Sequence, residues 1–137
     1  MKLVAVLLLA LVGCASPRPA ATPGDGCTAN AGSPLEGASI ATVSPLVDKV
    51  ESENKKVAFT RVVGAEIVLR AEPGVTPESL ERRARCHAAE VAGREHDPLA
   101  VPDVAVRVRP ASGAFALQIT SKDPAAAHEI LSRAQRL

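Results

Sequence analysis

The chain has 137 residues, enough for one domain and a tether, and its formal net charge is +1. A charge this close to zero argues against a partner such as nucleic acid or another acidic polymer. Trp and Tyr are absent and Phe occurs only at Phe59 and Phe115, so the stacking side chains that sugar and nucleobase sites use are nearly missing.

The N-terminus has the pattern of a secretory signal. Met1 and Lys2 form a short basic start, and an apolar run follows over residues 3–12. A run of this length covers only about 15 Å as a helix, whereas a bilayer core of ~30 Å needs about 20 residues. The pattern therefore predicts export and removal of the signal. Ordinary cleavage after Ala15 is an alternative, but it leaves Cys14 unexplained.

The tetrapeptide Leu11-Val12-Gly13-Cys14 closes the apolar run and resembles the lipobox of bacterial lipoproteins. The resemblance implies that residues 1–13 are removed as a signal peptide and that Cys14 carries diacylglycerol and an acylated amino terminus, with acyl chains such as palmitate. Two or more acyl chains hold a protein to a membrane lastingly. Ala15 stands where Asp would signal retention at the inner membrane, so the expected location is the periplasmic face of the outer membrane.

Two cysteines remain once Cys14 is assigned to the lipid. Cys27 and Cys86 would lie in an oxidising compartment, where disulfides persist. A bond between them would close a long loop and stabilise the fold by roughly 4 kcal/mol in the chain-entropy model. The sequence leaves open whether the two are bonded or free.

Residues 14–44 are rich in Pro, Gly and Ala with little periodic apolar pattern, which predicts a tether. Thirty such residues span on the order of 30 Å on average. After Ser44 as N-cap and Pro45 as first helical residue, residues 45–56 are predicted to form a short helix.

The domain proper is predicted over residues 57–137, where three segments alternate with period two. These predicted strands cover residues 63–70, 103–109 and 115–120, with apolar faces at Val63, Ala65, Ile67, Leu69, Val104, Val106, Val108, Phe115, Leu117 and Ile119. Thr76-Pro77 and Asp123-Pro124 place a capping oxygen before a proline and predict helices over 77–92 and from 124 towards the C-terminus.

The element order is strand, helix, strand, strand, helix, and each strand has one apolar face. This predicts an α+β fold, a small two-layer sandwich in which both helices cover one face of the sheet. A right-handed crossover leaves the third strand between the first and second. The expectation is a three-stranded sheet in the order 1-3-2, which resembles the split βαβ layout of a ferredoxin-like fold without its fourth strand.

One cluster has residue types suited to chemistry. Cys86, His87 and His96 could hold copper or zinc if the helix loosens and the loop folds back. Adjacent helical positions diverge, however, and no His-x-x-x-His or Cys-x-x-Cys spacing is present. The competing interpretation makes His87 a core histidine bonded to backbone, His96 a solvent-facing loop residue and Cys86 a buried or disulfide-bonded cysteine.

No set of nucleophile, base and orienting group is apparent, so the chain is not predicted to be an enzyme. The second face of the sheet carries Val68, Ala105, Ala114 and Ala116, which is only half polar and suits a docked envelope protein. A sheet edge could alternatively recruit a strand from another chain. The sequence therefore favours a non-enzymatic, lipid-anchored binding or structural module, with a metal-binding lipoprotein as the alternative.

Overall fold

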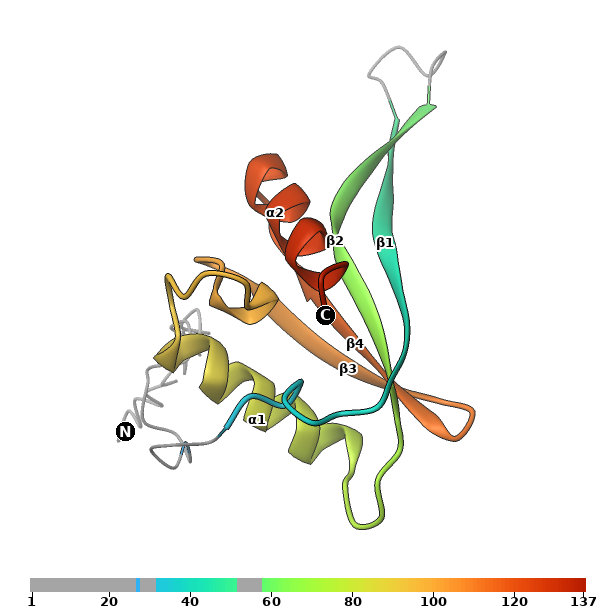
Figure 1. Cartoon of the computed structure of the whole chain (residues 1–137). Helices are drawn as coiled ribbons and strands as arrows, with labels where there is room; N and C mark the ends of the chain where they lie inside the picture. Colours follow the sequence, from blue (N-terminus) through green and yellow to red (C-terminus); the bar gives the residue numbers. More distant parts are fainter. Residues whose placement is uncertain (1–26, 28–31, 52–57) are drawn as a thin grey trace, which may run out of the picture.

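A computed structural model describes residues 27, 32–51 and 58–137. These residues form four strands, two α-helices and a short 3-10 helix, η1 (Figure 1). In chain order they are β1 (Ile40–Glu51), β2 (Ala58–Arg70), α1 (Pro77–Glu90), η1 (Pro98–Ala100), β3 (Ala105–Ala111), β4 (Ala114–Thr120) and α2 (Pro124–Ala134). Neither α-helix is both long and apolar enough to cross a membrane.

All four strands pair antiparallel, in the order β1-β2-β4-β3. The expected three-stranded sheet in the order 1-3-2 is therefore wrong, because β1 adds a fourth strand beside β2. The alternation of β1 is interrupted between Ile40 and Thr42, where β1 has an extra residue; at the second irregularity, beside Leu46, the extra residue is Val63 on β2. Pro45 lies within β1 and has no N–H to donate, which an edge strand tolerates because it pairs on one side only.

The short helix expected over 45–56 is also wrong, since residues 45–51 belong to β1 and residues 52–56 lie outside the described part. A single short helix is marginal in water, and pairing along the whole of β2 replaces it. The tether expected over 14–44 ends earlier than predicted. Pro34 and Leu35 are buried, and β1 already begins at Ile40.

Both helices begin where their capping signals predict. Thr76 Oγ1 accepts a hydrogen bond from the Ser79 amide at 3.2 Å, and Ser79 Oγ accepts one from the Thr76 amide at 3.0 Å. Asp123 Oδ1 accepts from the Ala125 amide at 3.0 Å. These bonds satisfy amides that the first helical turn leaves without partners. α1 ends at Glu90, two residues before the expected Ala92.

The helices cover one face of the sheet, α2 chiefly over β2 and α1 chiefly beside β3 (Figure 1). Alternate residues of the strands point into the layer between helices and sheet. The core there is apolar and includes Ala65, Ile67, Leu69, Leu80, Ala84, Leu99, Val106, Val108, Phe115, Leu117, Ile119, Ile130 and Ala134. The opposite face of the sheet carries no helix in the part of the chain that the structure describes.

At Gly64, β2 leaves the four-stranded sheet. Gly64 has φ +156°, and a Cβ at this position would collide with the carbonyl oxygen of Ile119 on β4. Only glycine permits this close backbone approach. Beyond it, residues 47–51 and 58–62 pair with each other alone, and we call this two-stranded projection the arm. Figure 1 shows the arm extending past α2.

Candidate functional site

The candidate cluster from the sequence lies at the end of α1. His87 is buried, and its Nε2 donates a hydrogen bond to Asp97 Oδ2 at 2.6 Å. The other oxygen of Asp97 accepts from the Leu99 amide at 2.9 Å and so caps η1. His87 is thus a core histidine, but its partner is a carboxylate rather than the expected backbone group. The missed signal was Asp97-Pro98, which repeats the start pattern of Asp123-Pro124.

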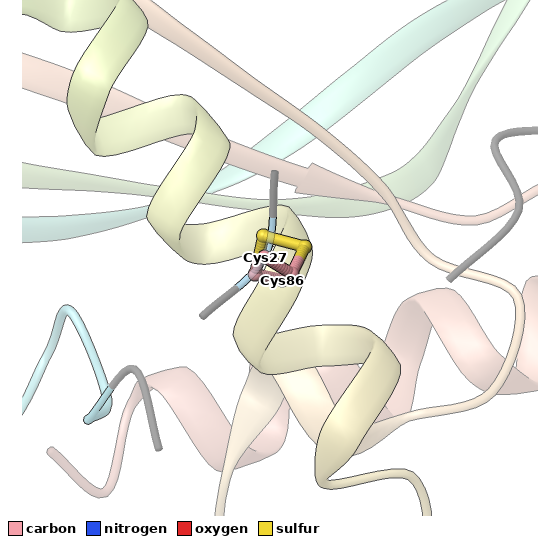
Figure 2. The surroundings of a disulfide bond; sticks show 2 residues. All are labelled: Cys27 and Cys86. Carbon is pink, nitrogen blue, oxygen red and sulfur yellow. A yellow bond between two sulfur atoms is a disulfide. The ribbon is translucent and has the colours of Figure 1, made fainter. Parts of the chain in front are cut away.

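Cys86 is joined to Cys27 by a disulfide, with the two Cα atoms 5.4 Å apart. Figure 2 shows the bond on α1, where Cys27 comes from the chain before β1. Of the two states that the sequence left open, the structure has the bonded one. In this state the Cys86 sulfur is not a thiolate and cannot act as the metal ligand considered above.

His96 is exposed in the loop after α1 and has φ 75°. Cys86, His87 and His96 do not form a ligand set here, and no group of three or more His, Cys, Asp or Glu side chains within the described ranges could hold a metal. The physical reason is helical geometry. Neighbouring residues on a helix point about 100° apart, so His87 points to Asp97 while Cys86 points to Cys27.

A hollow of about 590 Å³ adjoins this cluster. Its titratable lining side chains are Glu36, His87, Glu90, Arg94, Glu95, His96 and Asp97. The four carboxylates outnumber the single arginine, Arg94, so the lining is mostly acidic and disfavours an anionic ligand. No local sequence pattern predicts this hollow, because it forms where residues 32–36 come beside the end of α1.

The second candidate is the uncovered side of the sheet, which we call the open face. Two cross-strand rows define it, Thr42–Val68–Ala116–Arg109 and Ser44–Glu66–Gln118–Arg107. Directly paired residues point to the same side of a sheet. The residues predicted for a docking face, Val68, Ala105, Ala114 and Ala116, all lie on it.

Charge on the open face is mostly positive. Arg70, Arg107 and Arg109 are exposed, whereas the one carboxylate in the two rows, Glu66, accepts a hydrogen bond from Gln118 Nε2 at 2.8 Å. Ala116 at the centre of the face is only 9% exposed, because its neighbours on three strands surround a small side chain. The open face is therefore flat in the middle and basic towards β3.

Both edges of the sheet resist strand addition. At β3, Glu81 on α1 accepts a hydrogen bond from the Val108 amide at 2.8 Å, and Arg85 donates to the Val106 carbonyl at 3.4 Å. The β1 edge carries Pro45 and the charged residues Asp48 and Lys49. Proline and charged side chains keep natural edge strands from pairing with strands of other chains. Recruitment of a strand at an edge is therefore less favourable than docking on the open face.

No protein-family model matches the chain, and no curated protein or solved structure matches it. Cys14 and the rest of the tetrapeptide that resembles a lipobox lie outside the described residues, so lipidation stays a prediction from the sequence. Any function must therefore be inferred from the chain's own residues.

Proposed function

We propose that this chain is a lipid-anchored cell-envelope protein that binds another protein through the open face of its sheet. One observation carries the proposal: the helices cover a single face of the sheet, and the opposite face is bare over the described residues, while side chains of α1 occupy the β3 edge. The lipobox at Leu11–Cys14 supports the anchoring part of the proposal.

The charge of the open face selects the class of partner. Arg107 and Arg109 lie side by side on β3 at the end of the two cross-strand rows, and neither belongs to an ion pair among the described residues. A protein surface with carboxylates would complement them, with small or flat side chains over Val68 and Ala116. Complementary charges of this kind raise the rate of association and fix the orientation of the partner.

Site-specific photo-crosslinking in membranes tests the docking part. A photoreactive residue at Thr42, exposed on the open face, should give an adduct of one defined mass. The same residue at Ser132, exposed on α2, is the matched control and should give none. Arg107→Glu with Arg109→Glu should abolish the Thr42 adduct. No adduct at Thr42, or one that survives the charge reversal, would refute docking on this face.

The anchoring part is tested separately. Cys14→Ser should abolish incorporation of labelled palmitate and release the protein or leave uncleaved precursor. Cys27→Ser removes another cysteine of the N-terminal region and should keep the label. Membrane attachment that persists unchanged in Cys14→Ser would show that the lipobox prediction is wrong.

A further inference from the structure

The arm exposes large apolar side chains. Val47 and Phe59 are 55% and 53% exposed, and Leu137 is the one other large hydrophobic residue so exposed within the described ranges. Phe59 is also one of only two Phe residues in a chain without Trp or Tyr. A two-stranded ribbon without further packing is marginally stable in water, and burying an aromatic ring in a contact is strongly favourable. The arm is therefore a surface that a partner would stabilise.

The register of the arm places four side chains on one side. Val50 pairs with Phe59, and Asp48 pairs with Arg61. Paired residues share a side, as do residues two apart in one strand. We call this set, Asp48, Val50, Phe59 and Arg61, the Phe59 face. The other side of the arm carries Val47, Lys49, Thr60 and Val62.

The Phe59 face carries one charge of each sign beside one apolar pair. Neither Asp48 nor Arg61 takes part in an ion pair among the described residues. Both also line a hollow of about 690 Å³ where the arm joins the sheet, so the face continues into a concave surface. Asp48 and Arg61 lie at the same position along the arm, on neighbouring strands. A second molecule with the same arrangement of charges can therefore neutralise both of them.

We propose that the Phe59 face binds the Phe59 face of a second copy of this chain. A two-fold axis parallel to the arm places each strand of one copy opposite the other strand of the second copy. It leaves every residue at the same position along the length of the arm. It therefore sets Asp48 against Arg61 of the second copy, and Val50 against Phe59 of the second copy, twice over by symmetry. No other relation of two such faces satisfies all four side chains at once. The Phe59 face lies on the same side of β1 as the open face, because Ser44 and Asp48 are four residues apart in a strand with no extra residue between them. The contact between copies nevertheless rests on the arm residues alone and does not depend on docking at the two cross-strand rows.

Crosslinking between two differently tagged copies of the full chain, produced together, tests this contact. One copy carries Val50→Cys and the other Phe59→Cys, and mild oxidation should give a heterodimer linked by a disulfide. The matched control pairs Lys49→Cys with Thr60→Cys, which are direct cross-strand partners on the other side of the arm, and should give about tenfold less, because the two sulfurs would lie outside disulfide range. Equal yields from the two pairs would overturn the proposal, as would adducts only with a different protein or none at all.

Charge reversal gives a second measurement, since the crosslinked fraction depends on the predicted ion pairs. Asp48→Arg on both copies places Arg against Arg and should lower the heterodimer yield about tenfold. Adding Arg61→Asp to both copies restores the opposite charges and should restore the yield. A yield that stays unchanged in Asp48→Arg, or that Arg61→Asp fails to recover, would contradict the two-fold arrangement.

Discussion

Nε2 of His87 on α1 lies 2.6 Å from Oδ2 of Asp97, which fastens the loop after α1 to that helix. The loop is also held from the other helix, because the Arg133 side chain on α2 donates to the carbonyls of Arg94 at 2.7 Å and of Asp97 at 3.1 Å. Together these bonds hold η1 with Leu99 in the core. The cluster that suggested metal chemistry in the sequence thus has a structural role.

Replacing Asp97 by Ala should destabilise the protein by about 2–3 kcal/mol, since His87 loses its buried partner and the Leu99 amide loses its cap. Urea denaturation measures the change. His96→Asn is the control: Asn accepts a positive φ, and an exposed change should stay within about 0.5 kcal/mol. An Asp97→Ala variant as stable as the control would show that the His87–Asp97 bond does not hold the loop.

Cys27→Ser should lower the free energy of unfolding by about 4 kcal/mol in the chain-entropy model, because Cys27 and Cys86 are 59 residues apart and their bond restricts the unfolded chain. Cys27 is exposed, so the substitution opens no cavity in the core. Thermal melting with and without a thiol reductant is the measurement. The reductant should lower the Tm of the wild type and leave that of Cys27→Ser unchanged; equal sensitivity in both proteins would exclude a stabilising disulfide.

Gly64→Ala should destabilise the protein by at least about 3 kcal/mol, since the new Cβ meets the Ile119 carbonyl and the backbone is strained. Gly32→Ala is the matched control, because a Cβ there has no neighbour within 4 Å and φ is ordinary. Its stability should equal that of the wild type or exceed it slightly. Circular dichroism melts of the two variants distinguish them, and a tolerated Gly64→Ala would contradict the close approach of β2 to β4.

Glu129 gives the fold a small dependence on pH. The hydrogen bond from Arg133 to its carboxylate, 2.7 Å long, holds the pKa of Glu129 below its ordinary value. A carboxyl group whose pKa is lowered in the folded state stabilises the fold at pH values above its ordinary pKa. This contribution is lost as the pH falls through the lowered pKa. The Tm of Glu129→Gln should therefore lie slightly below that of the wild type at neutral pH and approach it in acid.

The control for this pH dependence is the same comparison in an Arg133→Leu background, where the hydrogen bond is absent. There the effect of Glu129→Gln on the Tm should depend much less on pH, because only the weaker Coulombic attraction of Arg136 still lowers the pKa of Glu129. A difference between wild type and Glu129→Gln that grows on acidification would have the wrong sign for a lowered pKa.

The elements with an unbroken pattern could be predicted. Ala65, Ile67 and Leu69 alternate cleanly and are all buried, and the Thr76-Pro77 and Asp123-Pro124 signals mark both helix starts. β1 could not be predicted in the same way. An extra residue between Ile40 and Thr42 interrupts the period of two at its start, and as an edge strand β1 buries few side chains, so its two sides do not differ clearly in polarity. Its Ser44-Pro45 pair therefore resembled a helix start.

The sequence by itself determined the local features of this protein: where the helices begin, which sides of three strands are apolar, and which segment resembles a lipobox. These depend on residues near one another in the chain. Only the tertiary structure decided that β1 lies beside β2, that Cys86 bonds Cys27 and that His87 meets Asp97. Such pairings form only where the favourable free energy of the contacts exceeds the entropic cost of closing the chain between them. A local sequence pattern does not reveal where this condition is met.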